Sequence, residues 1–362
     1  MCWAHPTFSL SKFDVALGIR HYLGGMTVSV LIPCYNAAPF LAQALDSVFA
    51  QTRPPNQVVV VDDGSSDGSV DIARRYPVHL CCLPANTGHG RARNEGLRAV
   101  TSDAVAMLDA DDFWEPTHLA EVVGLLERHP EAVLASSHAQ AFGTKSFRVD
   151  PNFPIDSPDA TFRAAFDYWI APHNGLAIRT AALREVGGYC ETERLALDYD
   201  LILRLAYRFP FVAGERVTVW WRWHPSQLSS QHHLQRLAVR RHRARFIEWL
   251  RSEGEIELAA ELERRAFELW LRDLVAFRTD ARLLRAHLAE RAGLRDVPRS
   301  TLIRWHVRAV LGVVYYARGA KPLRAVYRKV RRFLAQQRLG ESFCSAYFFV
   351  VGLALDEGPS VL

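Results

Sequence analysis

The chain has 362 residues, of which 49% are hydrophobic and 23% are charged, and its formal net charge is +5. This composition is ordinary for a globular protein of one large or two smaller domains. The apolar run Phe343–Leu355 is shorter than the roughly 20 residues of a membrane span, and the six cysteines lack zinc-ligand or redox spacing. These features argue against a membrane-spanning or cysteine-based metal protein, and we expect reduced thiols in a cytoplasmic one.

The first 25 residues are expected to form an N-terminal extension. They lack the charged-then-apolar pattern of a signal peptide, and they end in Gly24-Gly25, directly before a clean strand pattern. Met26 is therefore a candidate alternative start.

From residue 26 onward, short β-branched runs alternate with segments of helical periodicity. The expected strands are Val28–Ile32, Val58–Val61, Val78–Leu83 and Ala104–Leu108. The expected helices are Phe40–Phe49, Ser69–Tyr76, Arg91–Val100 and Pro116–Arg128. Such alternation predicts an α/β fold with a mainly parallel sheet flanked by helices. In such sheets, ligands bind beyond the carboxyl ends of the strands.

Polar clusters follow three of these strands, at Pro33–Asn36, Asp62–Ser66 and Asp109–Asp112. The third cluster carries three carboxylates in four positions. Carboxylates this close repel one another unless a cation lies among them, and a hard divalent ion is the usual solution. A solvated acidic turn that caps the next helix is the alternative. Because the three clusters should converge at one edge of the sheet, a metal and phosphate site is favoured.

Beyond residue 136 the pattern is less regular. Residues 143–160 contain three prolines and are expected to form a loop. A strand at Asn174–Arg179, a helix at Tyr199–Tyr207 and an aromatic-rich strand at Val217–Trp223 should follow. From about residue 233 the chain is helical by pattern and rich in arginine, so we place a boundary near residue 230.

The polar clusters belong to an ordered series of short motifs. In chain order these are Val30-Leu-Ile-Pro-Cys-Tyr-Asn36, Gln51-Thr52, Val60-Val-Asp-Asp-Gly-Ser-Ser-Asp67, Asn86-Thr-Gly88, Arg91-Ala-Arg-Asn-Glu-Gly96 and Leu108-Asp-Ala-Asp-Asp112. Together, at this spacing, they resemble the family 2 glycosyltransferases, which have the GT-A fold that binds nucleotide-diphospho-sugars. The resemblance implies a catalytic domain at residues 26–230, after the extension at 1–25 and before a mainly helical, basic region at 231–362.

This resemblance implies a nucleotide-sugar site at the sheet edge. Its residues would be Pro33, Tyr35 and Asn36 after the first strand, Asp63 after the second, Arg91 on the third helix, and Asp109. Tyr35 would stack on the base, and Asp63 would accept a hydrogen bond from it, with Asp62 supporting the turn. Arg91 would face the nucleotide or its phosphates and could supply charge-assisted hydrogen bonds.

The same resemblance implies that Asp109 and Asp111 form the D-x-D pair that positions the donor and a metal. Asp112 is an alternative ligand, because some relatives use the equivalent position. Mg²⁺ or Mn²⁺ suits a site made of oxygen ligands, and it would stabilise the negative charge that develops on a diphosphate leaving group.

A catalytic base is implied by the later motif, Gly187-Gly-Tyr189 followed by Leu197-Asp-Tyr-Asp-Leu201. The family usually has a Glu-Asp pair here, with the Asp as base. This chain has Leu197 in place of the Glu and retains Asp198, which is our candidate base. Asp200 is the rival, and a helix N-cap is the structural alternative for Asp198.

Trp221-Arg-Trp-His-Pro-Ser-Gln-Leu-Ser229 resembles the segment that closes the catalytic domain. His224 is a candidate third metal ligand, although a histidine beside a proline is often structural. Trp220, Trp221 and Trp223 could stack on an acceptor sugar or could instead be core and cover residues.

The C-terminal region carries the basic charge. Residues 301–338 hold ten Lys or Arg and no Asp or Glu. Its amphipathic helices could lie on the inner face of an anionic membrane, or they could pack on the catalytic domain with a solvated basic face. No nucleic-acid-reading motif accompanies them, so we expect no nucleic-acid partner.

The sequence therefore predicts an inverting, metal-assisted glycosyltransferase of polysaccharide or cell-envelope synthesis. Its donor would be a nucleotide-diphosphate sugar, with a UDP-sugar as the family's commonest choice, and its acceptor a hydroxyl of a saccharide or lipid-linked molecule. A non-catalytic nucleotide-sugar-binding protein is the alternative that Leu197 raises. A sugar-nucleotide pyrophosphorylase would need a glycine-rich loop after the first strand, and a dehydrogenase would need G-x-G-x-x-G there.

Overall fold

The computed structural model describes residues 25–154, 157–224, 227 and 232–276. The chain divides into two compact units, Met1–Glu253 and Gly254–Leu362. The first unit runs past residue 230, because helix α8 (His232–Ser252) belongs to it. The described part of the second unit is helix α9 (Ile256–Ala276). The basic stretch at 301–338 lies outside the described residues, so its proposed membrane contact stays a prediction.

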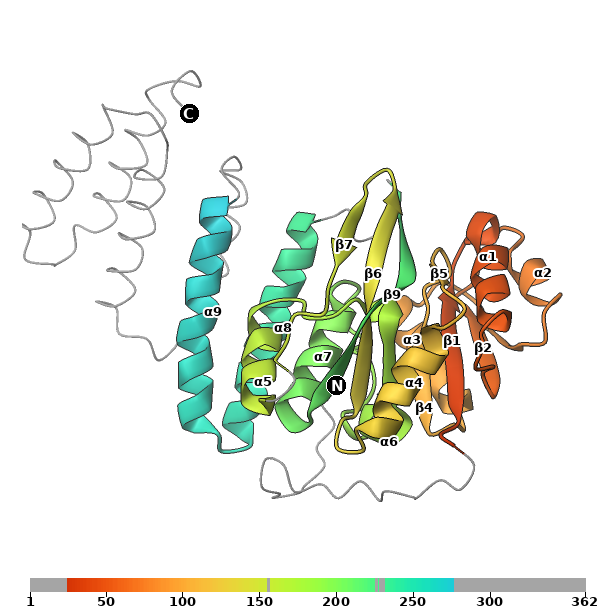
Figure 1. The fold of residues 1–362 in the computed structure, drawn as a ribbon. Helices are drawn as coiled ribbons and strands as arrows, with labels where there is room; N and C mark the ends of the chain where they lie inside the picture. Colours follow the sequence, from red (N-terminus) through yellow and green to blue (C-terminus); the bar gives the residue numbers. More distant parts are fainter. Residues whose placement is uncertain (1–24, 155–156, 225–226, 228–231, 277–362) are drawn as a thin grey trace, which may run out of the picture. The chain divides into compact units, whose positions relative to one another are not determined.

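The first unit is the predicted α/β fold (Figure 1). Its strands are β1 (Val28–Cys34), β2 (Gln57–Asp62), β3 (His79–Cys82), β4 (Ala104–Met107), β5 (Phe113–Trp114), β6 (Leu134–Gly143), β7 (Phe147–Val149), β8 (Leu176–Arg179) and β9 (Phe211–Trp223). Its helices before α8 are α1 (Ala38–Phe49), α2 (Ser69–Ala73), α3 (His89–Ala99), α4 (His118–Arg128), α5 (Pro158–Asp167), α6 (Thr180–Glu185) and α7 (Leu197–Arg208), with a 3₁₀ turn at His173–Gly175.

These strands form one sheet in the order β3-β2-β1-β4-β8-β6-β9-β5, and β7 pairs with β6. The pairs among β1, β2, β3 and β4 are all parallel, whereas β8 runs antiparallel to both β4 and β6. The carboxyl ends of β1, β2 and β4 therefore meet at one edge, with Cys34 opposite Asp62. This register brings the three polar clusters of the sequence together.

The expected loop at residues 143–160 is wrong in part. It contains the short strand β7 and the first turn of α5, which begins at Pro158. Proline is well tolerated in the first turn of a helix, and Ser157 caps this one by accepting a hydrogen bond from Ala160 N. A proline there marks a helix start, which the loop interpretation overlooked.

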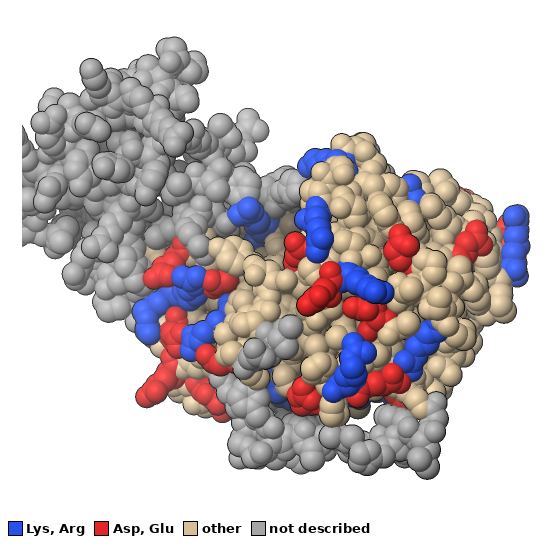
Figure 2. All heavy atoms as spheres, in the orientation of Figure 1, with Lys and Arg blue, Asp and Glu red and all other residues tan. Residues whose placement is uncertain are grey.

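The two faces of the sheet are packed differently. Val30 and Ile32 of β1 belong to the core that α1 and α4 complete with Leu41, Leu45 and Val122. On the opposite face, α3 contacts β1 and β2 closely because residue 96 is glycine. Figure 2 shows acidic and basic side chains interspersed over the described surface in view. None of the helices in the described ranges is long and apolar enough to cross a membrane.

Gly96→Ala is expected to destabilise the first unit by about 1–3 kcal/mol through overpacking. The added Cβ would lie 2.2 Å from Leu31 Cδ1 and 2.9 Å from Val61 Cγ2. Gly124→Ala in α4 is the control, since its Cβ would meet the flexible end of Arg128 at 3.1 Å, and alanine favours a helix by roughly 0.5–1 kcal/mol. Urea unfolding measures both changes, and equal stabilities would contradict the close contact.

Candidate active site

The acidic turn lies directly after β4. Its backbone closes with a hydrogen bond from Asp112 N to Asp109 O at 3.1 Å. This turn holds three carboxylates within four residues, and each of them meets a different partner from a different part of the chain. The three aspartates therefore have distinct environments despite their proximity.

Asp109 is paired with Arg93 of α3, at 2.7 Å between Oδ1 and Nη2. The arginine side chain is only 9% exposed, whereas that of Asp109 is 35% exposed and can still reach a ligand. Burial raises the pKa of Asp109, but the charges of Arg93, His173 and His89 outweigh it and hold the pKa below its usual value. Asp109 is therefore an ionised carboxylate at neutral pH.

Asp111 faces His224, whose Nε2 lies 2.9 Å from its Oδ2. The Asp111 carbonyl also accepts a hydrogen bond from Arg222 Nε at 2.9 Å. Burial and the nearby charge of Asp109 raise the pKa of Asp111, although the hydrogen bond from His224 opposes them. The structure therefore brings the predicted ligands Asp111 and His224 into direct contact.

Asp112 is buried and is held by the protein on both oxygens. Its Oδ1 accepts from the backbone N of Arg222 at 2.7 Å, and its Oδ2 accepts a short hydrogen bond from Asn174 Nδ2. Burial, followed by the charges of Asp111 and Asp109, raises its pKa well above the usual value. Asp112 thus connects β9 and the turn at residues 173–175 to the acidic turn. Of the three carboxylates, only Asp109 and Asp111 are then available for a ligand.

The donor set at the turn fits a divalent ion that arrives with a phosphate ligand. Within the described residues, no three His, Cys, Asp or Glu side chains group so as to hold a metal by themselves. Asp111 and His224 nevertheless offer two adjacent ligand atoms next to the part-exposed Asp109. Mg²⁺ in nucleotide sites takes one or two carboxylates and completes its shell with phosphate and water.

The residues predicted for the nucleotide line the neighbouring strand ends. Pro33 is buried within β1, and Tyr35 after it is 46% exposed and accessible for stacking. Asn36 has a left-handed backbone, with φ of +50°. Its Oδ1 accepts from Ser66 N at 2.9 Å, and its own N donates to Ser65 Oγ at 2.9 Å. Asn36 thus joins the loops after β1 and β2.

Asp63 is engaged by the loop before α3. Its Oδ1 accepts from both N and Oγ1 of Thr87 at 2.7 Å, and its Oδ2 accepts from Gly88 N at 2.8 Å. Asp62 accepts from Ser65 N at 3.0 Å through one oxygen, while its other oxygen is buried without a partner in the structure. In this structure Asp63 therefore organises the β3–α3 loop, and Asp62 supports its own turn.

Arg91 and Arg93 have different environments. Arg91 is exposed on the α3 face that also carries Glu95 and Arg98, and Arg93 is the arginine in contact with Asp109. Arg93 is not among the site residues predicted from the sequence. Helical periodicity could have found it, because residues 90, 93 and 97 share the buried face of α3.

Asp198 lies at the start of α7 and is half-buried. Its Oδ2 accepts a hydrogen bond from Trp169 Nε1 at 3.0 Å. Burial is the main influence on the pKa values of Arg93, His173 and Tyr189, and the charges of both Asp109 and Asp198 favour the protonated form of each. Asp198 therefore shares an electrostatic environment with the acidic turn.

The rival Asp200 is a buried structural residue. It forms an ion pair with Arg204 at 2.6 Å and contacts His242 Nδ1 at 3.1 Å. Burial acts to raise its pKa, but Arg204 and His242 lower the pKa to about 2. Leu197 is also buried, and it packs beside Gly90 of α3. The apolar replacement thus fills the junction between α3 and α7.

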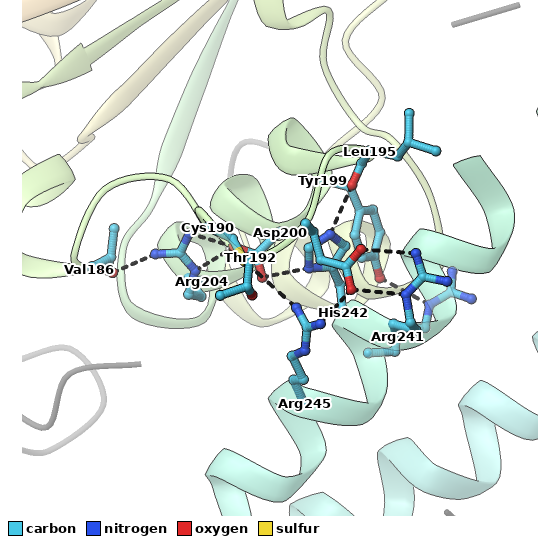
Figure 3. A network of polar contacts seen from close by, with 12 residues as sticks. Val186, Cys190, Thr192, Leu195, Tyr199, Asp200, Arg204, Arg241, His242 and Arg245 are labelled. Carbon is cyan, nitrogen blue, oxygen red and sulfur yellow. Dashed lines mark hydrogen bonds and ion pairs between the residues drawn. The ribbon is translucent and has the colours of Figure 1, made fainter. Parts of the chain in front are cut away.

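Helix α8 fixes the segment that leads into α7 (Figure 3). Arg241 and Arg245 both pair with Glu193, at 2.9 and 2.5 Å. His242 Nε2 lies 3.1 Å from the carbonyl of Leu195, and Gln235 Oε1 accepts from Ala196 N at 3.0 Å. Ala196 has a left-handed backbone, which is unfavourable for a residue with a Cβ. The α8 contacts hold this turn and with it the position of Asp198.

The tryptophans of β9 face two sides. Trp220 stacks on Phe113, with ring centroids 5.9 Å apart, and its Nε1 donates to Glu115 Oε1 at 2.6 Å, so it covers the core. The rings of Trp221 and Trp223 contact each other, with centroids 4.9 Å apart, and both contact the ring of Phe147 of β7. These contacts favour a packing role over the acceptor platform considered from the sequence.

Arg93→Met is expected to cost about 2–4 kcal/mol at pH 7. This is below the 3–5 kcal/mol typical of breaking a fully buried pair, because Asp109 retains some solvent. The pKa of Asp109 is lower in the folded state than its unfolded value of about 4, so the ionised carboxylate stabilises the fold above pH 4. This stabilisation is lost as the pH falls. The deficit should therefore shrink below pH 4 in urea titrations. Arg91→Met is the control and should change stability by less than about 0.5 kcal/mol.

Asp112→Asn should raise stability at pH 7 in metal-free buffer. A raised pKa means that the folded state binds the proton more readily than the unfolded state, so stability falls as pH rises above about 4. Asparagine removes that penalty while keeping an acceptor for Arg222 N, and its NH2 can donate to Asn174 Oδ1 once the Asn174 side-chain amide is rotated by a half-turn. Thermal unfolding should show a gap that widens from pH 4 to pH 7, and a less stable variant at pH 7 would contradict this.

Comparisons with known proteins identify the family of the chain. The family model for glycosyl transferase family 2 matches residues 29–187. The uncharacterised glycosyltransferase YwdF of Bacillus subtilis is 30% identical over 188 residues, which are 50% of this chain and 68% of YwdF. The uncharacterised glycosyltransferase alr2836 of Nostoc sp. is 32% identical over 172 residues, which are 44% of this chain and 53% of that protein.

Among solved structures, S. aureus TarS 1–349 in complex with UDP has the same fold, with a TM-score of 0.55 and 20% identity over 80% of each chain. The chain spans about half the length of some curated relatives that it matches, at 53% and 50% of two of them. The motif series, the α/β fold and the relatives agree, and the chain belongs to glycosyltransferase family 2.

Proposed function

We propose that the protein transfers a sugar from a nucleotide-diphosphate sugar, with UDP as the favoured nucleotide, to the hydroxyl of a saccharide or lipid-linked acceptor. One observation carries this proposal. Arg93, the partner of Asp109, and Gly90, which packs against Leu197 next to Asp198, share the buried face of α3, so a donor-side carboxylate and a candidate base would belong to one site. The UDP complex of S. aureus TarS, which has the same fold, supports a uridine donor.

The donor half of the site would be built from the strand ends. Tyr35 would stack on the base, and the Asn36 and Asp63 loops would enclose it. Asp109, Asp111 and His224 would hold a divalent ion against the diphosphate. That ion, Mg²⁺ or Mn²⁺, would neutralise the charge of the departing diphosphate. Arg93 keeps Asp109 ionised and oriented for this contact.

The acceptor half would centre on Asp198. Its carboxylate would remove the proton of the acceptor hydroxyl as that oxygen bonds to the anomeric carbon and the bond to the diphosphate oxygen breaks. Attack from the face opposite the leaving group inverts the anomeric configuration. Asp198 suits this role because it is half-buried and engaged by one N–H donor, whereas Asp200 is committed to Arg204 and His242.

A nucleotide-sugar-binding protein without transfer activity is the second candidate. Leu197 favours it, because a buried leucine stands where the family usually has a glutamate. The two candidates differ in turnover, since both predict donor binding and only the transferase releases nucleoside diphosphate.

The test is release of UDP from a panel of UDP-sugars in the presence of Mn²⁺ and candidate saccharide acceptors. Wild type should turn over at least one donor, and Asp198→Asn should reduce kcat about 10²- to 10⁴-fold with donor affinity retained. Asp71→Asn, at an exposed site on α2, is the matched control and should leave both unchanged. Binding without turnover by wild type would favour the second candidate, and full transfer by Asp198→Asn would remove Asp198 as the base.

A further inference from the structure

Two large aromatic side chains are exposed where α5 ends, beside the candidate base. Tyr168 is 50% exposed and Trp169 is 40% exposed. They fall outside every motif of the sequence analysis. Trp169 is distinctive because its Nε1 donates to Asp198 Oδ2 at 3.0 Å. An exposed indole is thus attached to the carboxylate that would receive the acceptor proton.

Trp169 is held rigidly from behind. Its ring meets the ring of Tyr199 edge-on, with centroids 5.6 Å apart. Tyr199 is buried, and its hydroxyl donates to Phe166 O at 2.7 Å and accepts from Arg243 Nε at 3.0 Å. The indole therefore rests on a fixed aromatic side chain, which lowers the entropy cost of stacking a ligand on it.

Arg243 of α8 also fixes the backbone that carries the indole. It donates to the carbonyls of Phe166 and Asp167 at 2.8 and 2.7 Å. These are among the last carbonyls of α5, which have no partners within the helix. The arginine thereby completes the helix end from which Trp169 projects. Helix α8 thus controls both Asp198 and its aromatic neighbour.

We propose that Trp169 forms an acceptor subsite that stacks on the apolar face of a pyranose ring and presents its hydroxyl to Asp198. The partly positive C–H bonds of a sugar face complement the negative face of an indole. A hydroxyl within reach of Asp198 brings its own ring next to Trp169, because the two side chains are hydrogen-bonded. This inference rests on the proposed function and assigns the acceptor to the saccharide class.

The same geometry gives Trp169 a second role in positioning the base. Its N–H occupies Oδ2 of Asp198, so the other oxygen is directed to the acceptor proton. Stacking depends on the ring, whereas base orientation depends on the N–H. Trp169→Ala removes both, whereas Trp169→Phe removes the N–H and keeps a smaller aromatic face for stacking. Trp169→Ala should therefore change both KM and kcat, whereas Trp169→Phe should mainly lower kcat.

The experiment measures binding of methyl β-glycosides of glucose, galactose and N-acetylglucosamine by saturation-transfer NMR, with UDP and the diamagnetic ion Mg²⁺ present. Wild type should bind at least one glycoside, and Trp169→Ala should weaken that binding about tenfold or more, with UDP affinity within about twofold. In transfer assays, Trp169→Phe should lower kcat severalfold with little change in KM.

Tyr168→Ala is the matched control. Tyr168 has an extended backbone, with φ of −149° and ψ of 172°, so its side chain and that of Trp169 project in opposite directions. Its removal should leave glycoside binding unchanged. Equal glycoside binding by wild type and Trp169→Ala would overturn the subsite. Wild type that binds UDP but none of the glycosides would overturn the saccharide assignment while leaving the donor proposal intact, whereas failure to bind UDP would count against the proposed function itself.

Discussion

The structure of the site depends on how the protein accommodates three carboxylates at one turn. Asp109, Asp111 and Asp112 would repel one another if their environments were alike. Each instead has its own partner: Arg93 from α3, His224 after β9, and Asn174 with the Arg222 backbone. These contacts connect distant segments to the end of β4. The negative charge of the three aspartates therefore also determines which elements surround the proposed donor site.

The division among the aspartates has a chemical consequence. Asp112 is enclosed by the protein and acts as a structural link, whereas Asp109 and Asp111 keep part of their surface open. Asp109 is kept ionised by Arg93, and the raised pKa of Asp111 reflects burial and repulsion that a cation would relieve. A positive ligand at the turn would offset this repulsion, which agrees with the proposed binding of a metal-bound diphosphate.

The proposed acceptor half of the site depends on a part of the chain beyond the family match, which ends at residue 187. Helix α8 contacts Glu193, Leu195, Ala196 and Asp200, and it also fixes the end of α5 through Arg243. The residues that α8 contacts flank Asp198 in the sequence, and none of these contacts involves the Asp198 carboxylate. The proposed donor site within the family match is therefore combined with a proposed acceptor region that is held by a helix outside this match.

Much of the donor half could be predicted from the sequence, because strand ends and their polar residues are local patterns. The acidic turn after β4 and the parallel strands are as expected, whereas the hydrogen bond between His224 and Asp111 was not predicted as such. Arg93 was missed because the motif pointed to Arg91, whereas the helical periodicity places Arg93 on the buried face of α3. The role of Trp169 could not be predicted, because it depends on a hydrogen bond to Asp198, which lies 29 residues later in the chain. Likewise, β6 depends on pairing with β8 and β9, and β7 depends on pairing with β6, which no local pattern encodes.

The central claim is that the acidic turn binds a divalent ion together with the donor diphosphate. Calorimetric titration of UDP into the full chain, with and without Mn²⁺, tests it most directly, using wild type and Asp111→Asn. The account predicts that Mn²⁺ tightens UDP binding by wild type about tenfold or more and that Asp111→Asn loses most of this gain. UDP affinity that is independent of the cation in wild type, or a gain that Asp111→Asn retains in full, would contradict it.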